Sequence, residues 1–270
     1  MSVLATRIAS ARSLLFVPGN RPERFGKAIA SAADLVVLDL EDAIAISDKD
    51  AARAAVEEFL TADVPVVVRI NGVDTGWCAD DLRMLRGRRC AVMVPKAHSA
   101  EQLQRVAAAL SPGTPLIALI ETAAGVHACA AVCSVETVVR AAFGSIDLAT
   151  ELGVDPSSFD ALRYARSAVV IGSAVAGLVA PLDGVTTDLT ENGLLSADIG
   201  HAVELGFGGK LCIHPRQTEF VNTQFSPSPE LVAWARRVIE ASADAGVCVV
   251  DGKMVDKPVI DRARRILSRA

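Results

Sequence analysis

The sequence predicts an α/β protein folded as a (β/α)8 TIM barrel with a C-terminal helical extension. Short aliphatic and β-branched runs alternate with longer Ala-rich amphipathic stretches, and this unit recurs eight times. Polar and charged residues gather where the runs end, whereas the starts of the runs are plain. Because barrel enzymes place their active sites at the carboxyl ends of the strands, this asymmetry also predicts an enzyme.

Size and composition suit this fold. The 270 residues lie within the range of one α/β barrel. A hydrophobic fraction of 51% with only 4% aromatic residues favours helices packed on parallel strands over a β-sandwich. A net charge of −5 argues against nucleic acid or an anionic membrane as the main partner. The six cysteines show no CxxC pair and no zinc spacing, so we expect buried free thiols and a cytoplasmic location.

Eight strands are expected in order along the chain. They are SLLFVP from Ser13, LVVLDL from Leu35, PVVVRI from Pro65, CAVMVP from Cys90, PLIALI from Pro115, TVVRAAFG from Thr137, APLDGVTTD from Ala180 and GKLCIHP from Gly209. The seventh is the weakest, because Pro181 and Gly184 interrupt it. The N-terminal apolar run is too short to span a membrane and is assigned to the first strand.

Helices are expected between the strands, for example at residues 48–60, 99–110, 160–177 and 229–243. Ser99 followed by Gln102 resembles an N-cap with a capping box. Strands separated by helices imply parallel crossovers, and eight units indicate a closed barrel. A doubly wound sheet is the alternative, but no GxGxxG follows any strand. The barrel is expected to span residues 1–244 and the extension residues 245–270.

Charged residues at the expected strand ends form one candidate site. In chain order they are Asp39, Glu41, Asp42, Arg69, Lys96, Glu121 and Asp147. The excess of acids over bases suggests a cation, and oxygen ligands without His or Cys select a hard one, Mg2+ or Mn2+. Glu121 and Asp147, which follow neighbouring strands, are the candidate ligand pair. The four scattered histidines argue against zinc or non-heme iron.

The three acids that follow the second strand pose a separate question. Strand alternation puts Asp39 and Glu41 on one face and Asp42 on the other. We therefore expect Asp39 and Glu41 to hold Arg69 and metal-bound water, and Asp42 to order the loop toward Lys49.

Each of these charged residues also has an ordinary structural interpretation. Acids at strand ends cap helices or pair with a local base. Glu121 opens a helix, where a helix-dipole role competes with metal binding. Lys96 has the position of an exposed loop lysine. The combination of these residues at one end of the barrel favours a site.

Eight segments in order, from Arg12 to about Ala263, together resemble the citrate lyase β-subunit-like family. They are RSLLFVPGNRPERFGKA, LVVLDLEDAIAISDKDAAR, VVVRIN, VMVPKAHS, LIALIETAAGV, FGSIDLATELG, KLCIHPRQ and KMVDKPVIDRA. Members of this family are Mg2+-dependent lyases that act on 3-hydroxyacyl-CoA thioesters such as malyl-CoA, citramalyl-CoA and citryl thioesters. The resemblance implies cleavage to acetyl-CoA and a 2-oxo acid by a homotrimer or hexamer. In such assemblies the C-terminal segment reaches over a neighbouring subunit's site.

The resemblance also implies roles for individual residues. Glu121 of ETxxG and Asp147 of GxxDL would hold Mg2+, and Arg69 of RIN would bind the substrate's carboxylate or carbonyl oxygens. Asp256 of the terminal MxDxP stretch would transfer a proton at the acetyl-CoA methyl carbon. Its structural alternative is an N-cap of the last helix.

Further substrate-binding residues are implied by position in the matching segments. Asp39, Glu41, Asp42 and Lys49 match the LDLED…K segment. Lys27, beside Arg21 and Arg24, lies where family members contact the CoA phosphates, although such charges are more often a solvated helix face. Ile213 and His214 would lie near the thioester end of CoA.

Two other functions remain open from the sequence. One is a class II 2-oxo acid aldolase that works without CoA. The other is a non-catalytic barrel subunit that binds metal and CoA. The second alternative arises from Ile146, because many family members carry an acid immediately before the metal-binding Asp. Loss of that acid would alter the surroundings of the metal ligand.

Overall fold

Eight parallel strands close into a barrel in the computed structural model, which describes residues 2–62, 64–189, 192–242 and 248–269. Each strand pairs with its neighbours in sequence, and β1 also pairs with β8. The strands are β1 (Ser13–Pro18), β2 (Leu35–Asp39), β3 (Val67–Arg69), β4 (Ala91–Val94), β5 (Leu116–Ile120), β6 (Val138–Phe143), β7 (Leu182–Asp183) and β8 (Gly209–Cys212). The predicted (β/α)8 fold is therefore confirmed. The seventh strand, the weakest of the expected strands, is present as β7 and has only two residues.

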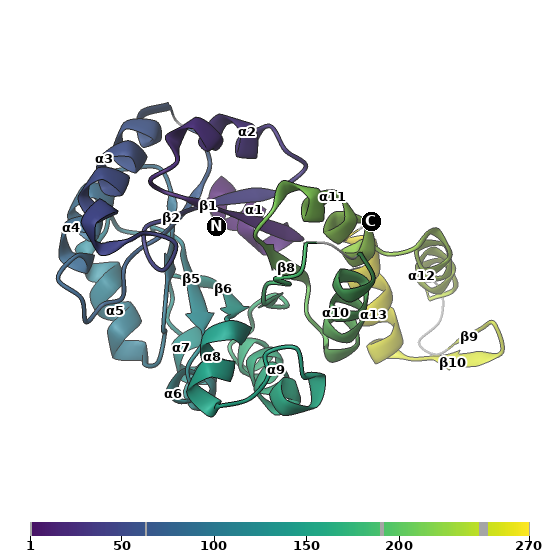
Figure 1. Cartoon of the computed structure of the whole chain (residues 1–270). Helices are drawn as coiled ribbons and strands as arrows, with labels where there is room; N and C mark the ends of the chain where they lie inside the picture. The colour runs from purple at the N-terminus through teal and green to yellow at the C-terminus, as the bar shows by residue number, and fades with distance from the viewer. Residues whose placement is uncertain (1, 63, 190–191, 243–247, 270) are drawn as a thin grey trace. The chain divides into compact units, whose positions relative to one another are not determined.

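Helices follow the strands and surround the barrel (Figure 1). They are α2 (Phe25–Ile29), α3 (Lys49–Phe59), α4 (Cys78–Leu85), α5 (Ala100–Ala109), α6 (Ala123–His127), α7 (Cys129–Cys133), α8 (Ser145–Leu152), α9 (Phe159–Val175), α10 (Asn192–Leu205) and α11 (Pro215–Phe225). Short 3-10 helices lie at Pro22–Arg24, Ile46–Asp48 and Leu60–Ala62. The expected Ser99 cap is confirmed, because its hydroxyl accepts from the Gln102 N–H at 3.1 Å. Among the described residues, no helix has both the length and the apolar composition to cross a membrane.

A helix that the sequence analysis assigned to the first strand precedes the barrel. This helix, α1 (Val3–Ser10), is capped by Ser2, and its Ile8 is buried against the inner barrel side chains. Arg140 of β6, also buried, donates to the carbonyls of Ile8 (2.7 Å) and Ala11 (2.6 Å). The guanidinium thereby satisfies carbonyls at the end of α1, which would otherwise lack intrahelical partners.

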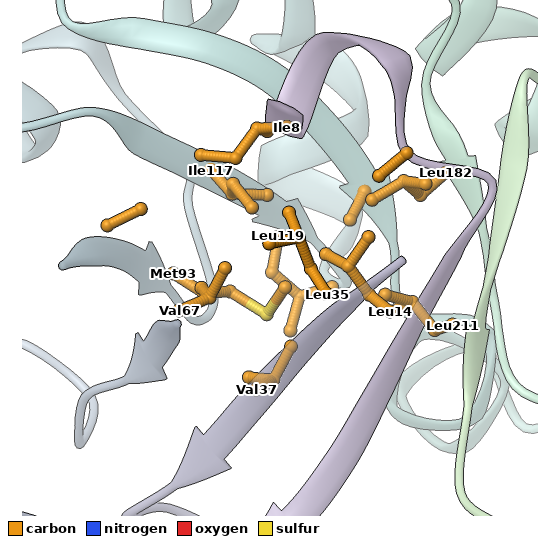
Figure 2. Close-up of a cluster of buried hydrophobic side chains, with 13 residues drawn as sticks. Ile8, Leu14, Leu35, Val37, Val67, Met93, Ile117, Leu119, Leu182 and Leu211 are labelled. Carbon is orange, nitrogen blue, oxygen red and sulfur yellow. The ribbon is translucent and has the colours of Figure 1, made fainter. Parts of the chain in front are cut away.

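Aliphatic side chains from alternate strand positions fill the barrel interior (Figure 2). The cluster comprises Ile8, Ala11, Leu14, Leu35, Val37, Val67, Ala91, Met93, Ile117, Leu119, Ala142, Leu182 and Leu211. It is a packed core and not a pore, as is typical of eight-stranded barrels. On each strand, the inward-facing side chain that follows this core therefore lies at the mouth of the barrel.

Contacts divide the chain into two units, Met1–Asn222 and Thr223–Ala270. The second unit contains α12 (Pro229–Ala241), a hairpin of β9 (Cys248–Val250) and β10 (Lys253–Val255), and α13 (Lys257–Leu267). Its own core holds Ala235, Val238, Val250, Val255 and Ala263. The predicted boundary at residues 244 and 245 lies outside the described residues, and the hairpin was not predicted.

Candidate active site

Side-chain alternation brings charged residues from three strands to the carboxyl end of the barrel. Asp39 is two positions after the core residue Val37, Arg69 two after Val67, and Glu121 two after Leu119. Because alternate residues of a strand face the same side, each charged group continues a core-facing row. The register pairs Asp39 directly with Arg69.

Arg69 is held by a bidentate ion pair. Its Nε donates to Asp39 Oδ1 at 2.7 Å and its Nη2 to Asp39 Oδ2 at 2.6 Å. The guanidinium carbon lies 4.8 Å from the centroid of the Phe16 ring. Burial disfavours the charge, but the attraction and hydrogen bonds of Asp39 outweigh it and raise the pKa of Arg69. Arg69 is thus a fixed cation at the mouth of the barrel.

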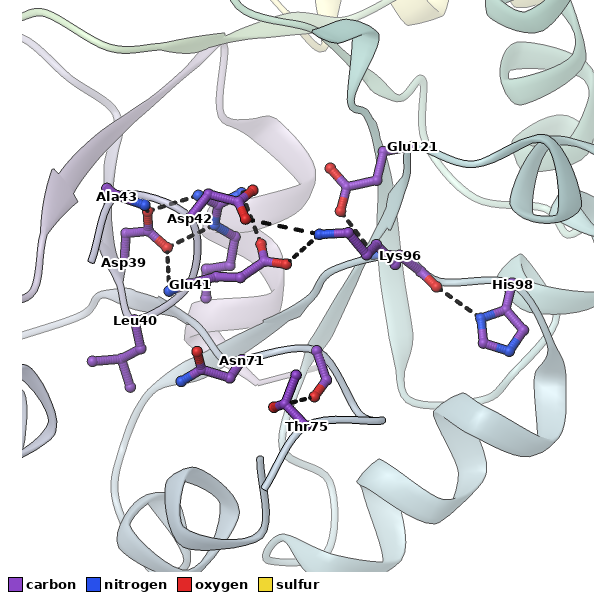
Figure 3. A network of polar contacts seen from close by, with 12 residues as sticks. Asp39, Leu40, Glu41, Asp42, Ala43, Asn71, Thr75, Lys96, His98 and Glu121 are labelled. Carbon is purple, nitrogen blue, oxygen red and sulfur yellow. Dashed lines mark hydrogen bonds and ion pairs between the residues drawn. The ribbon is translucent and has the colours of Figure 1, made fainter. Parts of the chain in front are cut away.

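Glu41 and Asp42 complete the acidic cluster around Arg69. Figure 3 shows both acids with Asp39 and Lys96. Arg69 Nη1 lies 3.1 Å from Glu41 Oε2 and 3.6 Å from Asp42 Oδ2. Lys96 Nζ lies 2.6 Å from Glu41 Oε1 and 3.8 Å from Asp42 Oδ1. The expectation that Asp42 turns away from the other two acids is wrong. Strand β2 ends at Asp39, so strand alternation no longer governs the loop that carries Asp42.

Lys49 orders this loop by a different route from the one expected. Its Nζ donates to the carbonyls of Leu40 (2.8 Å) and Glu41 (2.7 Å), and the side chain is buried. Burial lowers the pKa of Lys49 against the attraction of the nearby acids. Lys49 therefore fixes the backbone that presents Glu41 and does not pair directly with the carboxylate of Asp42.

Glu121 is a buried carboxylate in an acidic environment. It is only 1% exposed, and its Oε1 accepts the backbone N–H of Lys96 at 2.8 Å. Burial, followed by repulsion from Glu41 and Asp147, raises the pKa of Glu121 to about 8. The attraction of Arg69 lowers the pKa of Glu121 but does not offset burial and repulsion, so a further positive charge would favour the ionised carboxylate.

Gly144, at the end of β6, makes room for the Glu121 carboxylate. A Cβ atom at position 144 would lie 2.4 Å from Glu121 Cβ and 2.5 Å from its Oε2. Any larger residue would therefore displace the carboxylate. This role of Gly144 was not predicted from the sequence, because it depends on a spatial contact between neighbouring strands.

Helix α8 begins directly after Gly144 and carries Asp147 in its first turn. The charge of Asp147 raises the pKa of Glu121. Glu151, one turn later on α8, accepts the N–H of Ala123 at 2.9 Å. This bond ties the helix that carries Asp147 to the segment that follows Glu121. The two predicted metal ligands are thus electrostatic neighbours on linked segments.

The donor set fits a hard divalent cation. Glu121 and Asp147 offer carboxylate oxygens, which Mg2+ prefers, and the repulsion between them would be offset by a cation. No group of three or more His, Cys, Asp or Glu in the described part of the chain could hold a metal ion. A bound Mg2+ would thus rely on two carboxylates, with water and substrate supplying the other positions.

The remaining predicted residues, all in the described part of the chain, have no recorded contact with this charged cluster. Ile213 and His214 directly follow β8 at the same end of the barrel, and both backbone N–H groups donate to Gln217 Oε1 (2.9 and 3.2 Å). Lys27 is exposed on α2. Asp256 belongs to the second unit, where its side chain caps α13 by accepting the Val259 N–H at 3.4 Å.

Another group that sequence reasoning missed supports β3. Asp81 of α4 is fully buried and accepts the backbone N–H (2.9 Å) and the side-chain amide (2.7 Å) of Asn71. It also accepts from Arg53 Nε at 2.8 Å. Asn71 of the RIN segment could have indicated this group, because a buried side-chain amide needs hydrogen-bond partners.

Comparison with known proteins identifies the family of this chain. Residues 12–215 match the HpcH/HpaI aldolase/citrate lyase family. The chain is 39% identical over 264 residues to a citrate lyase subunit beta-like protein of Mycobacterium tuberculosis, covering 95% of this chain and 94% of that protein. It is 37% identical over 273 residues to a (3S)-malyl-CoA thioesterase of Cereibacter sphaeroides, with coverages of 96% and 94%.

The solved structures extend the agreement to the whole fold. The protein CitE of Mycobacterium tuberculosis in complex with magnesium, acetoacetate and coenzyme A superposes with a TM-score of 0.83 at 37% identity, covering 97% of this chain and 98% of that one. The resemblance inferred from the eight sequence segments is confirmed. This chain belongs to the HpcH/HpaI aldolase/citrate lyase family.

Proposed function

We propose that the protein is a Mg2+-dependent carbon–carbon lyase that cleaves a 3-hydroxyacyl-CoA thioester of the malyl, citramalyl or citryl type into acetyl-CoA and a 2-oxo acid. The observation that carries the proposal is the buried Glu121 carboxylate. Burial and the charges of Glu41 and Asp147 raise its pKa to about 8, against the attraction of the fixed cation Arg69. The related CitE structure with magnesium, acetoacetate and coenzyme A supports the same ligand classes.

Cleavage of such a thioester makes defined demands on the site. The C2–C3 bond breaks, the 3-hydroxyl loses its proton, C3 becomes the carbonyl carbon of the 2-oxo acid, and the electron pair of the broken bond passes to the thioester enolate. Glu121 and Asp147 would hold Mg2+, which when bound acidifies the hydroxyl and offsets charge on the oxo acid. Mn2+ would satisfy the same oxygen ligands.

Arg69 would bind the carboxylate or carbonyl oxygens of the 2-oxo acid. Its hydrogen bonds to Asp39 use two of its five N–H donors, and the Nη1 side faces Glu41 and Asp42. Asp39 orients the guanidinium, while Lys49 fixes the loop that carries Glu41.

The proton for the enolate carbon would come from Asp256, which would act as the base in the condensation direction. We infer further that Lys27 contacts the CoA phosphates and that Ile213 and His214 lie near the thioester. A reducing, cytoplasmic location fits the free, buried thiols of Cys78, Cys90, Cys129, Cys133 and Cys212.

Assembly into a homotrimer or hexamer is part of this proposal, with Asp256 supplied to a neighbouring subunit's site. Helix α9 carries Tyr164, Ile171 and Val175 on one face, and these side chains are 81, 62 and 69% exposed. An exposed apolar face of this kind supports a contact between subunits. Light scattering tests the assembly, and a single species of 28.2 kDa would exclude it.

A thioester panel tests the reaction. Malyl-, citramalyl-, citryl- and methylmalyl-CoA are incubated with and without Mg2+, and release of the 2-oxo acid is followed. Glu121→Gln and Asp147→Asn are expected to lower kcat/KM by more than the roughly 10–100-fold typical of a metal ligand's hydrogen-bonding partners. Asp256→Asn is expected to lower kcat by about 10²–10⁴-fold.

The control for the panel is Glu58→Gln, an exposed acid of α3, which should retain the wild-type rate. Full activity in either Glu121→Gln or Asp147→Asn would refute the metal assignment. Turnover of free 2-oxo acids without any response to CoA thioesters would indicate the aldolase alternative, and binding without turnover the non-catalytic one.

A further inference from the structure

Lys96 has a backbone conformation that its residue type disfavours. Its φ is +49°, and among the described residues only Asp251, at +50°, is another non-glycine residue with positive φ. For a residue with a Cβ this region costs roughly 1–2 kcal/mol, whereas glycine adopts it freely. Such strain persists only where the surroundings determine it, and it often marks a functional position.

Neighbouring segments fix the Lys96 backbone on both sides. Its N–H donates to Glu121 Oε1 at 2.8 Å, and its carbonyl lies 2.9 Å from His98 Nδ1 and accepts from Gln102 Nε2 at 3.4 Å. With Lys96 in the left-handed conformation, its N–H meets Glu121 while its carbonyl meets His98 and Gln102.

Helix α6 packs against the same turn. The residue after Lys96, Ala97, is buried and donates its N–H to the Leu119 carbonyl at 3.0 Å. A Cβ on Gly125 would lie only 2.4 Å from the Ala97 carbonyl oxygen. The turn therefore has little freedom to relax into another conformation.

The side chain of Lys96 reaches a different part of the site. Its ammonium lies 2.6 Å from Glu41 Oε1 (Figure 3). The other oxygen of Glu41 lies 3.1 Å from Arg69 Nη1. Glu41 is 6% exposed, so its charge needs both cations. Without the ammonium, Arg69 alone would balance Glu41, and the Nη1 group would be less available to a substrate.

We propose that Lys96 is a positioning residue that joins the two halves of the site: its backbone N–H orients the metal ligand Glu121, and its ammonium holds Glu41 so that Arg69 can bind a 2-oxo acid. This inference rests on the proposed function for the identity of the two ligands. Glycine at position 96 would adopt the left-handed conformation without strain but could not supply the ammonium. The strain at Lys96 is therefore consistent with a need for both its backbone N–H and its side chain.

Two substitutions separate the backbone role from the side-chain role. Lys96→Gly keeps the left-handed turn and removes the ammonium, whereas the β-branched Lys96→Val opposes the turn itself. Calorimetry measures the Kd of Mg2+ alone, and then the Kd of pyruvate in saturating Mg2+. Neither measurement depends on turnover, so both remain informative if no thioester is cleaved.

The proposal predicts distinct patterns for the variants. Lys96→Gly should bind Mg2+ within about threefold of wild type. It should bind pyruvate about 10–100-fold more weakly, the range typical when a residue that supports the ligands of a metal site is removed. Lys96→Val should weaken Mg2+ binding about 10-fold or more. Lys96→Arg, which retains the positive charge, should restore most of the pyruvate affinity that Lys96→Gly loses.

Asp251→Gly is the matched control, because it relieves the same left-handed strain in the exposed turn between β9 and β10. It should leave both dissociation constants unchanged. Wild-type pyruvate affinity in Lys96→Gly would overturn the role of the ammonium. Loss of Mg2+ affinity in Lys96→Gly equal to that in Lys96→Val would overturn the backbone role. If Lys96→Val does not fold, Lys96→Ala, whose Cβ also disfavours this turn, replaces it.

Discussion

At the scale of single residues, the site depends on a carboxylate that is costly to ionise. Glu121 was predicted as a metal ligand from its place at a strand end, but its burial and its contact with Gly144 come from packing between β5 and β6. Those contacts join residues more than 20 positions apart, and no local pattern encodes them. They explain why the carboxylate has a pKa near 8 and why a cation should bind it strongly.

The raised pKa of Glu121 predicts a pH dependence of Mg2+ binding. The folded, metal-free protein keeps this proton up to about pH 8, whereas the unfolded chain releases it near the ordinary value of 4.5. The metal-free fold should therefore lose stability as pH rises from about 4.5 to about 8. Because Mg2+ needs the carboxylate, binding at pH 6.5 should release about one proton, and binding at pH 9 none.

Calorimetry in buffers of different ionisation enthalpy counts these protons. The affinity for Mg2+ should strengthen as pH rises from 6.5 to 8 and level off above it. Glu121→Gln should remove the proton release. Equal proton counts at pH 6.5 and pH 9 would show that Glu121 is already ionised in the metal-free protein.

At the scale of elements, β7 shows how a weak strand is retained in a closed barrel. Its Asp183 accepts from Arg166 Nε at 3.0 Å and lies 3.2 Å from Lys210 Nζ, and all three side chains are buried. Although burial opposes ionisation, Lys210 and then Arg166 lower the pKa of Asp183. The network joins α9, β7 and β8, so it compensates for the two-residue strand through partners that the sequence does not place together.

Asp183→Asn should therefore destabilise the protein by about 3–5 kcal/mol, because it leaves two buried cations without their shared carboxylate. The measurement is the free energy of unfolding from urea titration. Glu57→Gln, which removes a half-exposed partner of Arg88, serves as the comparison and should cost less than about 1 kcal/mol. Similar losses in the two variants would mean that the buried network does not hold β7.

Other elements mark the limits of sequence reasoning. The eight strands were predicted because aliphatic runs recur between amphipathic stretches. Helix α1 was missed, although Ser2 followed by Ala5, Ile8 and Ala11 carries a cap and a helical apolar row. Its apolar residues were assigned to the adjacent strand, because short apolar runs do not distinguish the two states.

At the scale of the whole molecule, barrel geometry converts scattered residues into one site. The strand ends predicted that charged residues would meet at the carboxyl end of the barrel, and Asp39, Glu41, Arg69 and Lys96 do meet there. The loop after β2 did not follow strand alternation, so Asp42 was misplaced. Asp256, in the second unit, stays a prediction.

The most direct test of the central claim is the identity of the products formed from the best thioester of the malyl-, citramalyl- and citryl-CoA set in the presence of Mg2+. Chromatography quantifies acetyl-CoA, free CoA and the 2-oxo acid. A carbon–carbon lyase yields acetyl-CoA and the 2-oxo acid in equal amounts, with no free CoA and no reaction after removal of Mg2+. Release of free CoA with the intact hydroxy acid, in the absence of acetyl-CoA, would contradict a carbon–carbon lyase and identify a thioesterase.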